Sequence, residues 1–273
     1  MKVQSNTKII VIVGPTASGK TALAIELAKK YNGEIISADS RQVYRGLDIG
    51  TAKDKSFPQH LIDIVDLDQD YNVTHFVRDA KKAIEDIAAR GKLPIIVGGT
   101  GFWIDALVYD YSFPEVSPRG ELREKLEHKS WQELFAQLEK LDPQRAKHID
   151  KHNKRRLIRA LEIANSGTPS PPPPWGEEQE GVFWLGIKIS RDELDARIAQ
   201  RLNEQFDQGL IEETKKLKNP NRFGLAYVPI AKYLKGEISE TEMRAQALRS
   251  IIQYSKRQMT WFKRNKNIRW IFP

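Results

Sequence analysis

Eight residues near the N-terminus have the types and spacing of a phosphate-binding loop, or P-loop. Residues 14–21 read GPTASGKT, which fits the pattern G-x-x-x-x-G-K-[ST] between a β-rich run and a helical run. In that context backbone N–H groups and the positive end of the helix dipole converge on phosphate oxygens. We expect a diphosphate or triphosphate ligand, with the Lys20 ammonium bridging phosphate oxygens and the Thr21 hydroxyl ligating Mg²⁺. The predicted loop consists of Gly14, Pro15, Thr16, Ala17, Ser18, Gly19, Lys20 and Thr21.

Two other groups of residues follow predicted strands. Asp39 ends the run at 34–39, and the glycine-rich run at 98–101 ends the run at 93–99. Because the carboxyl ends of parallel strands meet at one edge of a sheet, we expect both groups to lie beside the loop. A carboxylate there can hold Mg²⁺ through water or accept a proton from an attacking nucleophile. A helix cap and a tight turn are the simpler interpretations, but three converging strand ends favour a site.

The hydrophobic pattern predicts the sheet that positions these groups. Short β-branched runs alternate with amphipathic helical runs over residues 8–110, which is typical of a buried parallel sheet. The expected fold class is α/β, with a P-loop NTPase-like parallel sheet core and an inserted small helical domain. The predicted strands are residues 8–13, 34–39, 93–99 and 183–190, and the predicted helices of the core include residues 21–31, 76–91 and about 240–264.

The inserted domain is indicated by a change of pattern. Helical runs with polar breaks replace the strand–helix alternation from about residue 117 to residue 166. The run at 168–181, TPSPPPPWGEEQEG, predicts a stiff, exposed connector. We therefore expect residues 1–116 and 176–273 to form the core with a basic C-terminal helix, and residues 117–175 to form the inserted domain with the connector.

Positive charge is concentrated in two segments of a chain whose net charge is +8. Residues 145–159 contain seven basic residues and one acid, and residues 244–273 contain eight basic residues and no acid. This segregation indicates a polyanionic partner larger than a metabolite, although a solvated basic face on ordinary helices is the alternative. The chain has no cysteine, which excludes disulfides and thiolate metal sites. With no apolar run of about 20 residues and no signal-peptide pattern, we expect no membrane association and a cytoplasmic protein.

Several longer motifs resemble the tRNA dimethylallyltransferase family, also called the tRNA isopentenylpyrophosphate transferase family. They follow one another in order along nearly the whole chain, and several are not shared with other P-loop proteins. The motifs are GPTASGKT (14–21), SADSRQVYRGLDIGTAK (37–53), HLIDI (60–64), FVRDA (76–80), LPIIVGGTG (93–101), DPQRAKHID and NKRRLIRALEI (within 142–163), GEIS (236–239) and KRQMTWF (256–262).

The resemblance implies a reaction and its substrates. The loop holds the pyrophosphate of dimethylallyl diphosphate, and the inserted domain binds the anticodon stem-loop of tRNA. The N6 amine of the adenosine 3′ of the anticodon, at tRNA position 37, attacks the allylic carbon. The products are N6-isopentenyladenosine and pyrophosphate, and Mg²⁺ is the expected cofactor. We also expect a monomer.

The resemblance also implies roles for individual residues. Asp39 hydrogen-bonds the amine and accepts its proton, Thr100 lies near the reacting groups, and either Arg197 or Arg201 clamps the pyrophosphate. Spacing alone leaves the choice between these two arginines open. The residues that the resemblance places at the tRNA are Asp39, Ser40, Arg41, Gln42 and Thr100 in the core, and Arg123, Arg155, Arg156, Leu157, Ile158 and Arg159 in the inserted domain.

Two other functions are compatible with a phosphate-binding loop. A small-molecule or nucleoside kinase would use ATP as phosphoryl donor, and the basic run at 145–159 could then be its arginine-bearing lid. A non-catalytic RNA-binding NTPase would explain the charge but has no use for the motif at 37–53. Turnover of an allylic diphosphate without ATP would exclude both alternatives.

Overall fold

The computed structural model describes residues 7–111, 113, 120–147, 149–166 and 179–272. The chain forms two compact units, one made of residues 1–110 and 175–273 and the other of residues 111–174. The predicted boundaries at 116/117 and 175/176, and residues 168–178 of the predicted connector, lie outside the described residues.

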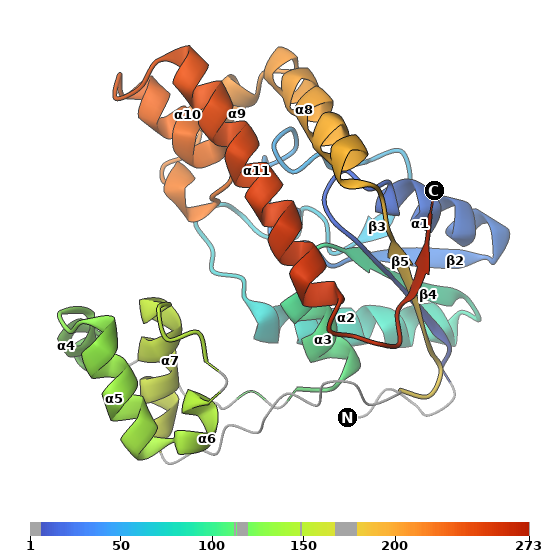
Figure 1. Cartoon of the computed structure of the whole chain (residues 1–273). Coiled ribbons are helices and arrows are strands. Elements are labelled where there is room, and N and C mark those ends of the chain that lie inside the picture. Colours follow the sequence, from blue (N-terminus) through green and yellow to red (C-terminus); the bar gives the residue numbers. More distant parts are fainter. Residues whose placement is uncertain (1–6, 112, 114–119, 148, 167–178, 273) are drawn as a thin grey trace. The chain divides into compact units, whose positions relative to one another are not determined.

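A six-stranded parallel sheet is the centre of the first unit (Figure 1). Its strand order is β3-β2-β4-β1-β5-β6, and every pairing is parallel. The strands are β1 (Ile9–Val13), β2 (Gly33–Ser37), β3 (Gln59–His60), β4 (Leu93–Gly98), β5 (Val182–Ile187) and β6 (Arg269–Ile271). The glycine-rich loop joins β1 to the first helix, so the predicted P-loop NTPase-like α/β core is confirmed.

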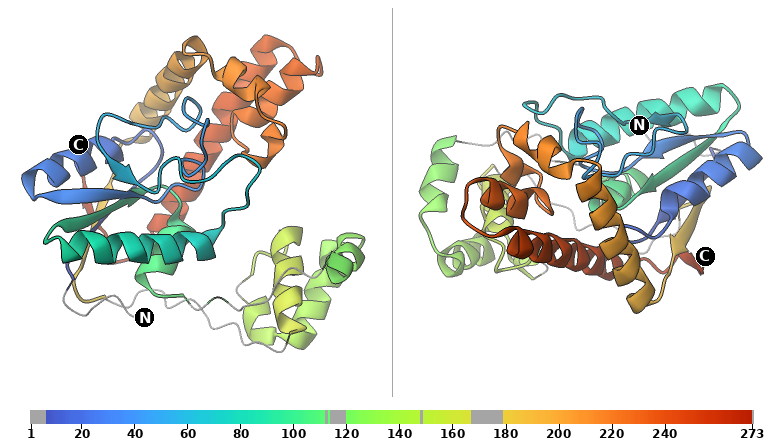
Figure 2. Two further views of the ribbon diagram at one scale, coloured as in Figure 1. Left: turned by 180° about the vertical axis from the view of Figure 1, so that it is seen from behind. Right: turned by 90° about the horizontal axis from the view of Figure 1, so that it is seen from above.

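Helices cover both faces of this sheet. In the right-hand view of Figure 2 the sheet lies between α1 (Lys20–Lys30) and α2 (Val73–Ala89). Ala24 and Ala28 of α1 pack on Ile12, Ile35 and Ile95, which are 0% exposed. Burying each of these isoleucines contributes roughly 1.5–3 kcal/mol. This core fixes the strand ends from which the polar loops emerge.

The C-terminal part of the first unit is helical. It contains α8 (Arg191–Asp207), α9 (Leu210–Lys215), the 3₁₀ turn η1 (Pro220–Arg222), α10 (Tyr227–Leu234) and α11 (Glu240–Phe262). The sequence sets the start of α11 with a capping box, in which the Ser239 N–H donates to Glu242 Oε2 at 2.9 Å and the Ser239 hydroxyl accepts from the Glu242 N–H. This long helix and α3 (Gly101–Val108) pack against each other.

The second unit is a small helical bundle with its own core. It contains α4 (Gly120–Glu127), α5 (Trp131–Leu141), α6 (Pro143–Ala146) and α7 (Lys154–Ala164). Leu134, Leu138, Leu157 and Leu161 pack together and are 0% exposed, as the amphipathic pattern of α5 and α7 requires. The short helix α6 was not predicted.

Candidate active site

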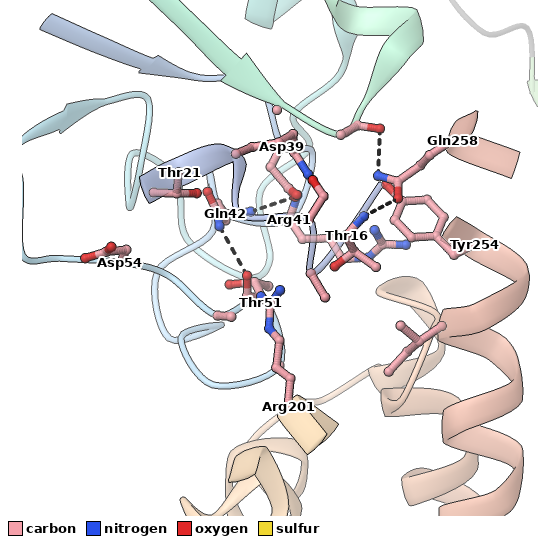
Figure 3. Close-up of a pocket in the computed structure, with 18 of the residues that line it drawn as sticks. Thr16, Thr21, Asp39, Arg41, Gln42, Thr51, Asp54, Arg201, Tyr254 and Gln258 are labelled. Carbon is pink, nitrogen blue, oxygen red and sulfur yellow. Dashed lines mark hydrogen bonds between the residues drawn. The ribbon is translucent and has the colours of Figure 1, made fainter. Parts of the chain in front are cut away.

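A polar pocket of about 290 Å³ lies at the carboxyl edge of the sheet (Figure 3). Residues 16–21 of the predicted loop line it, whereas Gly14 and Pro15 are buried and do not. The other walls come from the turn after β2, residues 50–54, the end of β4, and helices α8 and α11. The sequence therefore identified the correct edge of the sheet and the loop at its centre.

Lys20 has a strongly lowered pKa in this pocket. Its ammonium donates to the Pro15 carbonyl oxygen at 2.6 Å. Burial, together with the nearby Arg201 guanidinium, lowers the Lys20 pKa from 10.5 to about 7, and the Asp39 carboxylate opposes this shift. Arg201 is also largely buried, and burial lowers its pKa as well. Two desolvated cations beside a glycine-rich loop form an environment that favours a polyanionic ligand.

Asp39 faces these cations from the turn after β2. It lies two residues beyond the last residue of the strand, Ser37, rather than at its end as predicted. Its Oδ1 accepts the backbone N–H groups of Arg41 at 2.9 Å and of Gln42 at 3.4 Å. These bonds fix the orientation of the carboxylate, and no hydrogen bond to Oδ2 occurs among the described residues. Asp39 is therefore a turn residue, as the simpler interpretation of the sequence predicted, and it also forms part of the pocket wall.

The two candidate arginines of α8 occupy different environments. Arg201 lines the pocket and lies close enough to Lys20 and Asp39 to affect their electrostatics. Arg197 forms an ion pair with Glu193 at 2.6 Å on the surface of the same helix and does not line the pocket. The structure thus brings Arg201 to the site and places Arg197 away from it.

The remaining predicted residues of the core lie around the Asp39 turn. The Ser40 N–H donates to Thr100 Oγ1 at 3.1 Å, which joins the turn after β2 to the turn after β4. The Arg41 Nε donates to the Phe223 carbonyl oxygen at 2.6 Å, and its guanidinium lies 5.2 Å from the ring centre of Tyr254. Burial and the Asp39 carboxylate raise the pKa of Tyr254, so its hydroxyl remains protonated.

Gln258 of α11 was not predicted and connects two walls of the pocket. Its Oε1 accepts the Thr16 backbone N–H at 2.8 Å, and its Nε2 donates to the Gly99 carbonyl oxygen at 2.9 Å (Figure 3). The Thr16 N–H is therefore occupied by protein rather than directed at a ligand. Gln258 belongs to the motif KRQMTWF (256–262), which carries part of the family resemblance.

A loop between β2 and β3 forms a further wall that the sequence analysis did not assign. Gly50, Thr51, Ala52 and Asp54 of this loop line the pocket, and the Thr51 carbonyl accepts the Gln42 Nε2 at 3.1 Å. Lys53 lies between Ala52 and Asp54 in this loop. Its side chain is 0% exposed and forms ion pairs with Asp48 and Asp63.

The predicted tRNA contacts in the second unit divide into two groups. Arg155 and Arg156 are exposed on α7, whereas Leu157 and Ile158 are 0% and 4% exposed in the core of the bundle. The side chains of Leu157 and Ile158 pack inward, so only their backbone atoms could contact tRNA, and their assignment to tRNA stays a prediction.

Arg123 and Arg159 share a buried acidic partner. Both guanidinium groups lie 3.3 Å from the carboxylate of Glu162, whose side chain is 0% exposed. The two arginines remain 42% and 35% exposed, so part of each guanidinium is accessible. Their ion pairs with Glu162 fix the positions of two cations on the surface of the second unit.

Across the described ranges, no group of three or more histidine, cysteine, aspartate or glutamate side chains is arranged to hold a metal ion. In the same part of the chain, no helix has the length and apolar character needed to cross a membrane.

Comparison with known proteins identifies the relatives of this chain. The family model described as IPP transferase matches residues 42–265. A tRNA dimethylallyltransferase from Anoxybacillus flavithermus is 41% identical over 279 residues, which cover 96% of this chain and 89% of that protein. The tRNA dimethylallyltransferase 1 of Geotalea uraniireducens is 42% identical, with 94% and 88% of the two chains covered.

Solved structures agree with the sequence relatives. The tRNA isopentenylpyrophosphate transferase of Bacillus halodurans superposes with a TM-score of 0.73 at 36% identity, covering 98% of this chain and 90% of that chain. A eukaryotic dimethylallyltransferase crystallised while acting on tRNA superposes with a TM-score of 0.80 at 26% identity, covering 98% and 74%. The chain therefore belongs to the tRNA dimethylallyltransferase family.

Proposed function

We propose that this protein transfers the dimethylallyl group from dimethylallyl diphosphate to N6 of the adenosine 3′ of the anticodon in tRNA. The observation that carries the proposal is the pocket in which Asp39 faces Lys20 and Arg201 beside the glycine-rich loop. Family membership supports the same substrates, because relatives over nearly the full length of the chain are named tRNA dimethylallyltransferases.

In the proposed reaction the N6 amine attacks C1 of the dimethylallyl group. An N–C bond forms, the C1–O bond to the diphosphate breaks, and pyrophosphate leaves with the electron pair of that bond. Lys20, Arg201 and the backbone N–H groups of the loop stabilise the negative charge that develops on pyrophosphate. Asp39 accepts the proton that N6 loses, since its Oδ1 is fixed by two backbone N–H groups and its Oδ2 remains available.

Mg²⁺ remains a prediction that the chemistry of the pocket supports. The hydroxyl of Thr21 and the carboxylates of Asp39 and Asp54 line one cavity, and hard oxygen ligands of this kind suit Mg²⁺. A bound ion would neutralise charge on the leaving pyrophosphate. We expect Thr21→Ala to raise the Mg²⁺ concentration required for half-maximal turnover, whereas Thr260→Ala, a matched change on the exposed side of α11, leaves it unchanged.

Recognition of tRNA is proposed for both units. The target base must leave the stacked loop to reach the pocket, because a stacked base hides the reacting amine. Arg41 and Gln42 line the pocket wall where such a base would enter. In the second unit the exposed Arg155 and Arg156, with Arg123 and Arg159 held by Glu162, provide cations for backbone phosphates. A monomeric state and a cytoplasmic location remain predictions.

A kinase is the alternative that the pocket alone would allow, and the relatives do not favour it. The direct test incubates the protein with unmodified tRNA, dimethylallyl diphosphate and Mg²⁺, without ATP, and analyses tRNA nucleosides by mass spectrometry. We expect one adenosine per tRNA to gain the dimethylallyl mass. Transfer of a labelled γ-phosphate from ATP, with no prenylated nucleoside, would contradict the proposal.

A further inference from the structure

A buried carboxylate outside the reaction site holds the loop that forms one wall of the pocket. We call residues 48–54 the pocket loop. Glu213 of α9 is 8% exposed, and its Oε2 accepts the backbone N–H groups of Asp48 at 2.8 Å and Ile49 at 2.7 Å. Its Oε1 accepts the Gly50 N–H at 3.0 Å. Three consecutive backbone donors therefore converge on one carboxylate.

Two neighbouring side chains complete the attachment. The Tyr227 hydroxyl donates to Glu213 Oε1 at 2.7 Å, and the Gln205 Nε2 donates to the Ile49 carbonyl oxygen at 2.5 Å. A β-carbon at Gly50 would lie 2.4 Å from the Tyr227 hydroxyl, so only glycine allows this close approach. These contacts attach the pocket loop to α8, α9 and α10.

The other side of the pocket loop lines the pocket. Thr51 and Asp54 line the pocket, and the Thr51 carbonyl accepts the Gln42 Nε2. The Gln42 Oε1 also accepts a hydrogen bond from the Ser37 hydroxyl at 2.9 Å, and the Gln42 backbone N–H donates to Asp39 Oδ1. A continuous set of hydrogen bonds therefore runs from Glu213 through the pocket loop to the turn that carries the proposed base.

Convergent backbone N–H groups of this kind form an anion-binding nest. In this protein the nest is filled by the chain's own carboxylate, so its donors point away from the pocket. The glycine-rich loop then presents backbone donors to the diphosphate, while the pocket loop contributes Thr51 and Asp54 to the pocket wall. Without Glu213 the three donors would lose their acceptor, and the Thr51 and Asp54 side chains would lose the support that places them in the pocket wall.

We propose that Glu213 is a positioning residue, which orients the pocket loop for the diphosphate substrate by filling this nest. The inference rests on the proposed function for the identity of the substrate. It is distinct from a general stabilising role, because it predicts a change in diphosphate binding that loss of folded protein would not produce.

The adjacent residue supplies a matched control. Glu212 has the same side chain one position earlier on α9, but it is 64% exposed and pairs with Lys215. Glu213→Gln keeps the shape of the side chain but turns an amide donor toward the loop donors. We expect it to lower kcat/KM for dimethylallyl diphosphate by about 10- to 100-fold, mainly through KM, the scale of a displaced positioning group. All constants of Glu212→Gln should match those of wild type.

A purely structural role predicts a different result. Loss of folded protein lowers the concentration of active enzyme, which a single-turnover burst measures, and leaves KM unchanged. Equal KM values for the diphosphate in Glu213→Gln and Glu212→Gln would therefore overturn the proposal. If Glu213→Gln does not fold, Tyr227→Phe removes one of the four bonds to the carboxylate. We expect a smaller rise in the same KM, and no rise would also overturn it.

A second measurement does not depend on catalysis. Hydrogen exchange of the backbone amides at residues 48–50 should accelerate in Glu213→Gln and in Tyr227→Phe, and the affinity for pyrophosphate should fall in both. Unchanged exchange and affinity would refute the role of Glu213. A wild-type protein that binds pyrophosphate but forms no prenylated nucleoside would refute the proposed function instead, and the comparison of variants would still decide the role of Glu213.

Discussion

We expect the binding of pyrophosphate to protonate Lys20. Burial and Arg201 lower its pKa to about 7 in the protein without ligand, so about half of the molecules carry a neutral amine at pH 7 and about nine-tenths do so at pH 8. Phosphate oxygens next to the amine favour its charged form and raise the pKa. Binding should therefore take up about half a proton at pH 7 and about nine-tenths of a proton at pH 8.

The sign of the pH dependence follows from the same pKa. Below pH 7 Lys20 is already protonated, and affinity does not depend on its ionisation. Above pH 7 the neutral amine must first acquire a proton, so affinity should fall about tenfold for each further pH unit. Titration calorimetry with pyrophosphate at about pH 6, 7 and 8, in buffers of different ionisation enthalpy, measures both proton uptake and affinity.

Pyrophosphate also titrates in this range, so a control is required. Lys20→Arg keeps a positive charge that does not titrate near neutral pH. Subtracting its proton uptake from that of wild type leaves the contribution of Lys20. Equal proton uptake in wild type and Lys20→Arg would show that the pKa of Lys20 is not lowered. The same conclusion would follow if the pyrophosphate affinities of the two proteins changed equally between about pH 7 and 9. Either result would refute the explanation by burial and Arg201.

Three further predictions concern individual side chains. Asp39→Ala should lower the single-turnover rate at saturating tRNA by ~10²–10⁴, the range for a lost general base, and an unchanged rate would remove Asp39 from the mechanism. Arg201→Met should weaken pyrophosphate binding, whereas Arg197→Met, which loses only a surface pair with Glu193, should not; calorimetry that finds equal losses would contradict this assignment. Arg156→Ala should flatten the slope of log affinity for tRNA against log salt by ~1 while chemistry at saturating tRNA survives, and filter binding that gives equal slopes would indicate only a solvated face.

The sequence predicted the elements that local patterns determine. The glycine-rich loop, four strands and the long helices follow from hydrophobic periodicity and motif spacing, and all are confirmed within a few residues. The edge strands β3 and β6 were not predicted. Gln59–His60 has only two residues, and Arg269–Ile271 lies in a tail whose basic and aromatic residues show no strand periodicity.

Residues on helices were harder to assign from sequence alone. Arg197 and Arg201 are four residues apart on one face of α8, so spacing could not separate them, but they differ by about 6 Å along the helix axis. The run at 155–159 was assigned to tRNA as a block, although a helix of 3.6 residues per turn directs only part of such a run outward. Leu157 and Ile158 are the residues of this run whose side chains are buried in the bundle.

Polar contacts between residues far apart in the sequence were the hardest to predict. Glu213 and the pocket-loop N–H groups that donate to it are separated by 163–165 residues, and charged residues on short helices are usually solvated. A signal did exist for α11, where Ala247, Ile251, Tyr254 and Gln258 recur at helical spacing on one face. A glutamine in an otherwise apolar or aromatic stripe indicates a buried hydrogen-bonding role.

The bond between Gln258 and Gly99 has a consequence for how this sequence can vary. A β-carbon at position 99 would lie 2.1 Å from the Gln258 Nε2, so any larger residue there would force the amide out of its two hydrogen bonds. The two positions lie 159 residues apart and must therefore change together. A chimaera that takes its C-terminal helix from a relative should keep the pocket wall only where that helix brings a compatible amide to the glycine.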